Sequence, residues 1–94
     1  MFSCNRYTTA RVCEEVPFVL QMFMWSCIDM LPGEADYLQV FELTATSEGQ
    51  RIAHKQEQPP YRKEYLIPCA KPLSTKIFVI DDGEYATMLF AEEY

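Results

Sequence analysis

The sequence is poor in the residues on which most enzyme and cofactor sites depend. It contains one histidine, three glycines and four cysteines, with no Cys-x-x-Cys pair. Histidine exchanges protons near neutral pH, glycine-rich loops bind phosphates, and paired cysteines bind zinc. The GxGxxG, P-loop, GxSxG and HExxH motifs do not occur. We therefore expect no cofactor, no metal ion and no enzymatic activity.

The N-terminus also lacks the pattern of a secretory signal. The first residues, MFSCNRYTT, contain no basic region followed by an apolar run. We therefore expect a cytoplasmic protein whose thiols stay reduced, in which Cys4, Cys13, Cys27 and Cys69 behave as small apolar side chains. An even number of cysteines leaves two disulfides as the alternative.

Charge is distributed unevenly along the chain. The net charge is −6, yet residues 51–76 contain six basic and two acidic side chains. Basic residues interleaved with tyrosines can bind a nucleic-acid strand, because cations attract phosphates and aromatic rings stack on bases. The candidates are Arg51, Lys55, Tyr61, Arg62, Lys63 and Tyr65, and they must converge on one face. A solvated hairpin with an edge protected by lysine is the favoured interpretation, since the overall negative charge repels a polyanion.

The sequence contains enough apolar residues for the core of one domain. Apolar residues make up 49% of the 94 residues, which is enough for a core and argues against disorder. The stretch from Val16 to Leu31 has one acid and no base, and it predicts a helix that begins at Pro17 and ends before Pro32 and Gly33. Sixteen residues are too few to cross a bilayer core of about 30 Å, so no membrane span is expected.

Apolar side chains occur on both sides of this predicted helix. At 100° per residue one arc forms an ordinary core stripe, made of Val16, Val19, Leu20, Phe23, Met24, Cys27, Ile28, Met30 and Leu31. On the other half, Phe18, Met22 and Trp25 lie among polar residues that include Asp29. Exposed Trp, Met and Phe are typical of protein interfaces, so these four residues are the interface candidates. Burial of Phe18, Met22 and Trp25 under the first strand, the Pro68 to Pro72 loop or the C-terminal AEEY tail of the same chain is the alternative, and it is slightly favoured because a small domain often covers its helix on both sides.

Alternating patterns predict a sheet around the helix. Strands are expected at 6–12, 36–46, 51–58, 61–67, 76–80 and 84–91. The last two form a hairpin whose turn is Asp81-Asp82-Gly83, and 36–46 is expected to be central. The predicted fold is α+β: one long apolar helix packed on a curved antiparallel sheet of five to six strands, as a roll or partly open small barrel, with residues 1–94 forming a single domain.

Two groups of side chains have both a chemical and a structural interpretation. Asp81, Asp82 and Glu84 could hold a divalent cation through oxygen ligands, but a DDG turn uses aspartate for local hydrogen bonds, and that interpretation is favoured. His54 is expected to be an exposed residue on a polar edge strand.

Four segments together resemble a known family. The segments are EEVPFVLQMFMWSCIDML, DYLQVFELT, YLIP and KIFVIDDGEYATMLFAEEY, and they resemble a small Firmicutes family, domain of unknown function 960. Phe90 stands where that family's pattern has leucine, and Cys4, Cys13 and Cys69 look peculiar to this chain. The resemblance implies a small cytosolic bacterial protein and supplies no activity, cofactor or catalytic residue.

These observations favour a small acidic cytosolic protein that acts as a non-catalytic protein-interaction module. Its partner would be another protein, or a second copy that contacts the back of the helix. The alternative is a nucleic-acid-binding small barrel that uses the basic 51–76 segment.

Overall fold

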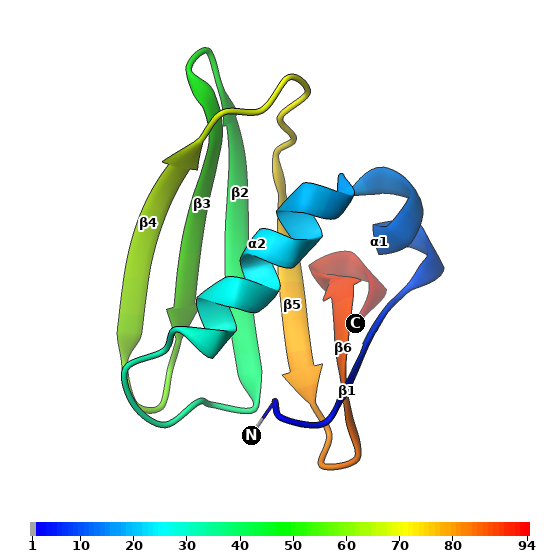
Figure 1. Ribbon diagram of the computed structural model, residues 1–94, viewed down its shortest axis with the longest axis vertical. Coiled ribbons are helices and arrows are strands. Elements are labelled where there is room, and N and C mark those ends of the chain that lie inside the picture. The colour runs from blue at the N-terminus through cyan, green and yellow to red at the C-terminus, as the bar shows by residue number, and fades with distance from the viewer. Residues whose placement is uncertain (1) are drawn as a thin grey trace.

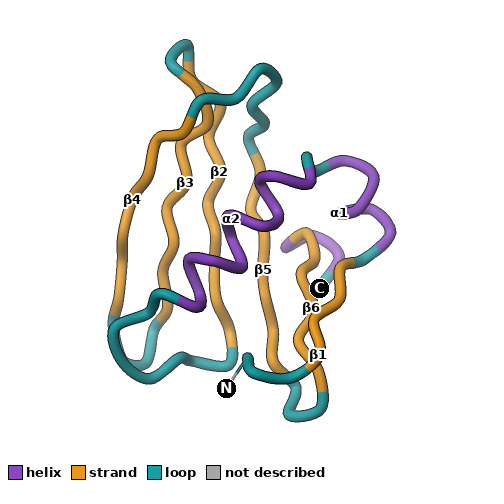
Figure 2. Tube along the Cα trace, viewed as in Figure 1, coloured by secondary structure: helices purple, strands orange, loops and turns teal. Residues whose placement is uncertain are grey.

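A six-stranded sheet, two α-helices and a final 3-10 turn make up the fold of residues 2–94, which are the residues described by the computed structural model (Figure 1). The elements are β1 (Asn5–Thr8), α1 (Ala10–Glu15), α2 (Phe18–Asp29), β2 (Leu38–Thr46), β3 (Gly49–Gln56), β4 (Tyr61–Ile67), β5 (Thr75–Asp81), β6 (Tyr85–Phe90) and η1 (Ala91–Glu93). Figure 2 shows α2 lying diagonally across one face of the sheet. The α+β class is therefore confirmed.

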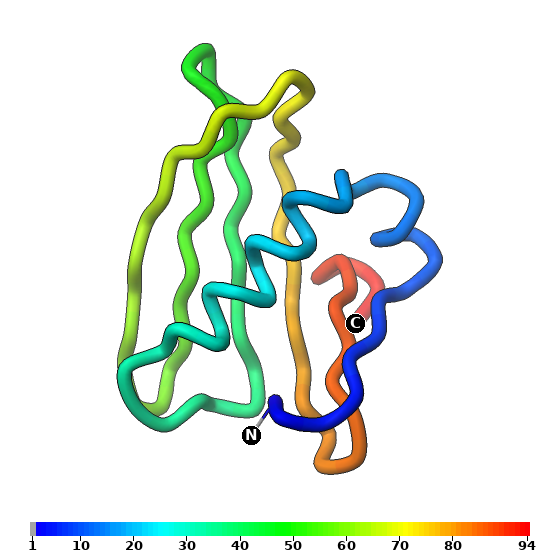
Figure 3. The backbone as a smooth tube through the Cα atoms, in the orientation of Figure 1, coloured from blue at the N-terminus to red at the C-terminus, as the bar shows by residue number. Residues whose placement is uncertain are grey.

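The strand order is β1-β6-β5-β2-β3-β4, and every pair is antiparallel except β1 with β6. The two ends of the chain lie side by side in this parallel pair, as Figure 3 shows. The sheet is therefore mixed rather than antiparallel, and it stays open between β1 and β4 instead of closing into a barrel. Strand β2 is central, as predicted, while β3 is an inner strand and not an edge.

The β5–β6 hairpin confirms the strongest local prediction of the sequence. Gly83 has a φ of 101°, which other residues rarely adopt. Asp82 Oδ1 accepts hydrogen bonds from the backbone N–H groups of Glu84 at 3.0 Å and Tyr85 at 3.1 Å. The aspartate thus stabilises the turn that the glycine permits.

The N-terminal region differs from the prediction. The helix expected to begin at Pro17 and end before Pro32 is α2, only 12 residues long, so it is not a long helix. Part of the expected strand 6–12 instead belongs to α1, which begins after Thr9. The Thr9 hydroxyl accepts a hydrogen bond from the Val12 N–H at 3.2 Å, and this N-cap starts a helix where β-branched residues suggested a strand. No helix among residues 2–94 has the length and apolar content needed to span a bilayer.

The buried face of α2 is rotated by about 60° from the predicted stripe. Val19 and Met30, predicted to be in the core, are exposed, whereas Gln21 and Trp25 are buried. Gln21 tolerates burial because its amide donates hydrogen bonds to the backbone oxygens of Val16 at 2.8 Å and Val12 at 3.3 Å. The sequence pattern placed Gln21 on the solvent side of the helix. In the fold its hydrogen bonds hold α2 against the end of α1.

The core lies between α2 and the sheet face that it crosses. The fully buried side chains on this face include Phe41, Ile52, Ile77, Val79 and Met88. Neither α1 nor α2 covers the opposite face, which we call the open face; there, Tyr94, which follows η1, packs against Phe78 with ring centres 5.9 Å apart. The strand register places on it Asn5 and Tyr7 of β1, Leu38, Val40, Glu42 and Thr44 of β2, Arg51, Ala53 and Lys55 of β3, Arg62, Glu64 and Leu66 of β4, Lys76, Phe78 and Ile80 of β5, and Tyr85, Thr87 and Leu89 of β6.

Candidate functional site

Trp25, the predicted anchor of an interface, is a core residue. Only 7% of its surface is exposed. The guanidinium of Arg6, from β1, lies 4.9 Å from the centre of its ring, a cation–π contact. Trp25 is therefore not an exposed interface anchor, and burial beneath the first strand of the same chain, the alternative that the sequence offered, is confirmed for this residue.

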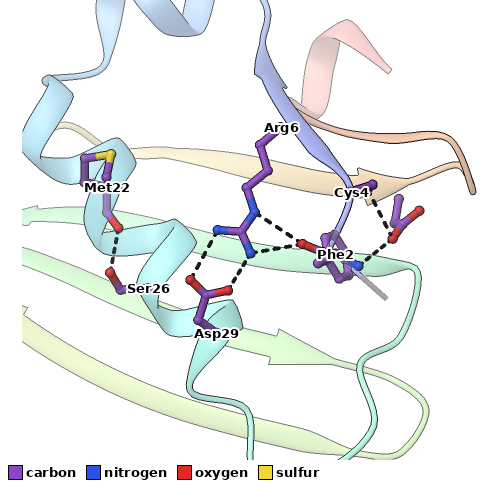
Figure 4. A network of polar contacts seen from close by, with 7 residues as sticks. Phe2, Cys4, Arg6, Met22, Ser26 and Asp29 are labelled. Atoms are coloured by element: carbon purple, nitrogen blue, oxygen red, sulfur yellow. Dashed lines mark hydrogen bonds and ion pairs between the residues drawn. The ribbon is translucent and has the colours of Figure 1, made fainter.

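Arg6 connects the N-terminal segment to the end of α2. Its guanidinium forms an ion pair with Asp29 and donates two hydrogen bonds to the Phe2 carbonyl oxygen, at 3.0 and 3.3 Å (Figure 4). Asp29 is therefore engaged inside the chain rather than free for a partner. Of the four interface candidates, Phe18 and Met22 remain as exposed apolar residues.

Exposed apolar side chains form a ridge along α2. Phe18 and Val19 are each 72% exposed, Met30 60% and Met22 49%. We call these four residues the α2 ridge. Between them, Ser26 uses its hydroxyl for a hydrogen bond to the Met22 carbonyl oxygen at 3.0 Å (Figure 4). The ridge presents side chains of a kind that is favoured in protein contacts.

An apolar groove adjoins the N-terminal end of the ridge. Its volume is about 380 Å³, and it lies between the start of α2 and the loop after β4. We call it the α2 groove, and its lining consists of Pro17, Val19, Leu20, Ile67, Pro68, Cys69, Ala70 and Lys71. The sequence predicted a loop bracketed by Pro68 and Pro72, but nothing in the pattern indicated that the loop lies against α2.

Acidic residues flank the ridge at both ends. Glu14 precedes α2 and is exposed. At the other end, a shallow hollow of about 460 Å³ is lined by Asp29, Glu34 and their apolar neighbours. Among the described residues neither Glu14 nor Glu34 forms an ion pair. Two acidic side chains without an ion pair, Glu14 and Glu34, thus lie near the ridge in sequence, while Asp29 is paired with Arg6 and Lys71 lines the groove.

The basic segment does not converge on one face, which the nucleic-acid alternative required. Arg51, Lys55 and Arg62 lie on the open face, whereas Lys63, Tyr61 and Tyr65 lie on the opposite side of the sheet. Tyr65 packs edge-on against Phe23 of α2 with ring centres 5.1 Å apart, and Tyr61 lies against His54. Both tyrosines are thus packed inside the fold, and the sheet separates Lys63 from Arg51, Lys55 and Arg62.

Carboxylates also compensate the cations on the open face. Glu42 accepts a hydrogen bond from Lys55 Nζ at 3.0 Å and lies 3.8 Å from Lys76 Nζ. Glu64 pairs with Arg62 at 3.0 Å and with Arg51 at 3.3 Å. The Lys55 hydrogen bond lowers the pKa of Glu42, so this carboxylate stays ionised at neutral pH. The cations are therefore less available for phosphate than their number suggests.

Asp81, at the start of the acidic turn, accepts hydrogen bonds from backbone N–H groups. Asp81 Oδ2 accepts a hydrogen bond from the Phe2 N–H at 2.6 Å, and Asp81 Oδ1 accepts one from the Gly83 N–H at 2.8 Å (Figure 4 shows the Phe2 contact). The hydrogen bond from Phe2 lowers the pKa of this carboxyl. Cys4 lies 3.8 Å from the same oxygen. Asp81 thus ties the N-terminal segment to the end of β5.

Replacing Asp81 with asparagine tests this anchoring role. We expect Asp81→Asn to lower the free energy of unfolding by about 1–2 kcal/mol, because asparagine keeps one acceptor oxygen where Phe2 and Gly83 each donate to a different carboxylate oxygen. Urea denaturation measures the change. The matched control is Glu84→Gln, an exposed acid of the same turn, for which we expect less than about 0.5 kcal/mol. Equal effects of the two substitutions would contradict the assignment.

His54 is fully buried, which corrects the prediction of an exposed edge residue. Its ring stacks on Phe41 with centres 4.4 Å apart, and its Nε2 donates a hydrogen bond to Gln39 Oε1 at 2.6 Å. Among the described residues its Nδ1 has no hydrogen-bond partner. Burial lowers the pKa of His54 from 6.5 to about 4, so the ring is neutral in the folded protein near pH 7.

The chain's thiols are free, as predicted. Cys27 faces the core, and burial raises its pKa to about 11. Because the thiolate is the reactive form, this side chain acts as a packing residue at neutral pH.

Comparison with known proteins places the chain in a family. Residues 5–93 match the model of the family described as Staphylococcal protein of unknown function (DUF960). A crystal structure of a protein of unknown function from Enterococcus faecalis has the same fold, with a TM-score of 0.82 and 24% identity over 97% of this chain and 91% of that chain. No protein with a curated description matches the sequence. The chain therefore belongs to the DUF960 family, as its sequence segments indicated.

Proposed function

We propose that this protein is a non-catalytic protein-interaction module that binds an apolar, positively charged segment of a partner protein through the α2 ridge and the α2 groove. The observation that carries the proposal is the exposure of Phe18, Val19 and Met22 beside a groove of about 380 Å³. Exposed apolar side chains next to a concave apolar surface are typical of helix-in-groove recognition.

The charge of this protein favours a positively charged partner segment. The chain has 14 acidic and 8 basic side chains. Glu34 lies beyond the C-terminal end of the ridge and Glu14 precedes its N-terminal end in sequence, while Lys71 is the one basic residue in the lining of the groove. A partner helix with apolar anchors and flanking lysines or arginines would be attracted to this region. A second copy is a poorer occupant of the ridge, because it would bring the same acids to the contact.

A synthetic peptide provides the test. The probe is a fluorescent amphipathic peptide of leucine and lysine of about 16 residues, which is long enough for four helical turns. We expect micromolar binding to the full chain by fluorescence anisotropy. The double variant Phe18→Ser with Val19→Ser should weaken binding about tenfold or more, because it removes two apolar anchors.

Two controls make the result specific to the ridge. Tyr37→Ser removes an exposed aromatic residue outside the ridge and should leave the affinity unchanged. A peptide with glutamate in place of each lysine should bind at least tenfold more weakly, since its charge repels the acids. Equal binding to the wild type and to the double variant would refute the proposed function.

A further inference from the structure

Asp29 and Trp25 hold the guanidinium of Arg6 at the C-terminal end of α2. The guanidinium donates to both carboxylate oxygens of Asp29, from Nη1 at 3.2 Å and from Nη2, and its centre lies 4.9 Å from the centre of the Trp25 ring. A carboxylate beside the face of an indole suits a planar cation, because its two oxygens match the guanidinium fork and the ring face attracts positive charge. We call Asp29 and the outer face of the Trp25 ring the cation site.

The cation site lies on the same side of α2 as part of the α2 ridge. Four residues fall within an arc of about 60° at 100° per residue, namely Phe18, Met22, Trp25 and Asp29. Seven positions, or about 10 Å along the axis, separate Met22 from Asp29. Figure 4 shows Met22 on an earlier turn of the helix and Asp29 at its end, where Arg6 reaches it from β1. One helical segment of about 16 residues can therefore contact the ridge and the cation site together.

The ion pair between Arg6 and Asp29 is open to exchange. The side chain of Arg6 is 29% exposed and that of Asp29 is 56% exposed, so a cation from a partner can reach the carboxylate. The backbone at Arg6 is held independently, because β1 pairs with β6 and Phe2 is buried. Arg6 Nε donates to the Phe2 carbonyl oxygen at 3.3 Å, a contact that does not involve Asp29. The guanidinium can therefore leave Asp29 while the first strand stays in place.

We propose that Arg6 is an internal competitor of the partner, and that an arginine of the bound segment displaces it from the cation site. This inference rests on the proposed function and specifies its partner: a helix with apolar anchors over Phe18 and Met22 and an arginine about two turns further on. Arginine fits better than lysine, since its planar fork reaches both oxygens of Asp29 and stacks on the ring. In the free chain Arg6 occupies the site, which lowers the apparent affinity.

The charges around the ridge favour a partner cation at the Asp29 end. Glu34 lines the same shallow hollow as Asp29, and among the described residues it has no ion pair. When Arg6 leaves, two carboxylates therefore face the incoming arginine. At the opposite end of the ridge, Lys71 lines the α2 groove and repels a cation. The difference between the two ends orients the partner along α2.

Fluorescence anisotropy with two peptides tests the proposal. One is the leucine–lysine peptide described above with arginine in place of each lysine, and the other has glutamine at those positions and is neutral. We expect Arg6→Gln to bind the arginine peptide about fivefold more tightly than the wild type does, as the loss of one exposed ion pair and one cation–π contact implies. Its affinity for the glutamine peptide should be unchanged, because a neutral side chain does not compete for Asp29.

Three further variants identify the cause of the gain. Arg6→Lys keeps the net charge and loses the planar fork, so it should give a smaller gain, and it stays informative if Arg6→Gln does not fold. Adding Asp29→Asn to Arg6→Gln should abolish the gain, because it removes the carboxylate of the cation site. Arg11→Gln is the matched control: it removes the same charge and a cation–π contact over Phe90, and it should leave both affinities unchanged.

The outcomes separate this inference from the proposed function. If Phe18→Ser with Val19→Ser weakens binding but Arg6→Gln has no effect, Arg6 is not a competitor and the proposed function stands. An equal gain for the two peptides, or a gain that persists with Asp29→Asn, would also overturn the competitor role. Absence of binding to the wild type and to Arg6→Gln alike would reject both proposals.

Discussion

Lowering the pH from 7 to 5 is expected to reduce the free energy of unfolding by about 2 kcal/mol, through His54 alone. The ring is buried between Phe41 and Tyr61, and burial lowers its pKa from 6.5 to about 4. Its Nε2 already donates to Gln39, so a proton added to Nδ1 would be buried without an acceptor among the described residues. The folded state therefore resists protonation.

The direction of the effect follows from the two protonation equilibria. The unfolded chain binds a proton at His54 below pH 6.5, whereas the folded chain does so only near pH 4. The stabilisation is complete above pH 6.5 and is lost as the pH falls toward 4, with a full loss of about 3 kcal/mol. Asp81 and Glu42 have lowered pKa values, so their losses begin at lower pH, near their unfolded values of 3.8 and 4.5.

His54→Gln isolates the contribution of the histidine. The glutamine amide can still donate to Gln39, but it does not titrate. Urea denaturation at pH values from 4.5 to 7.5 should show a steep fall in stability for the wild type and a much flatter profile for the variant. The slope is the readout, because the variant loses the contact with Phe41 and is less stable at every pH. Parallel profiles would show that His54 is not the group responsible.

The parts of the fold that local residues specify were predictable. The β5–β6 hairpin follows from Asp82 and Gly83, whose side-chain hydrogen bonds and backbone freedom suit the turn regardless of the rest of the chain. The parallel pairing of β1 with β6 was not predictable, because it joins residues about 80 positions apart through backbone hydrogen bonds that leave no local pattern. An antiparallel sheet was the natural expectation for strands joined by short turns.

Buried polar residues account for the errors at the candidate site. Gln21 and His54 are polar residues, and a hydrophobicity pattern assigns polar residues to the solvent-exposed side of a helix or strand. In the fold each has a specific hydrogen-bond partner, Val16 O for Gln21 and Gln39 for His54, and is buried. With Gln21 and Trp25 on its buried side, α2 has Val19 on its exposed side, opposite to the predicted arrangement. The apolar surplus of the helix was predictable, but which residues form its exposed side was not.

Replacing Trp25 with alanine is expected to destabilise the fold instead of removing an interface. We expect Trp25→Ala to lower the free energy of unfolding by about 4 kcal/mol, because it leaves a large cavity in the core and removes the ring beneath Arg6. That is a large share of the stability of about 5–15 kcal/mol that a typical domain has. Urea denaturation followed by circular dichroism measures the loss, since the protein has no other tryptophan for fluorescence.

Met22→Ala is the matched control on the same helix. Met22 is half-exposed on the α2 ridge, so its truncation leaves no core cavity, and alanine is the better helix former. We expect a change within about 0.5 kcal/mol. If Trp25→Ala were as stable as the wild type, the indole would have to lie outside the core, and the interface role that its sequence position suggested would stand again. A large loss with Trp25→Ala and none with Met22→Ala would leave the α2 ridge, and not the tryptophan, as the helix surface available to a partner.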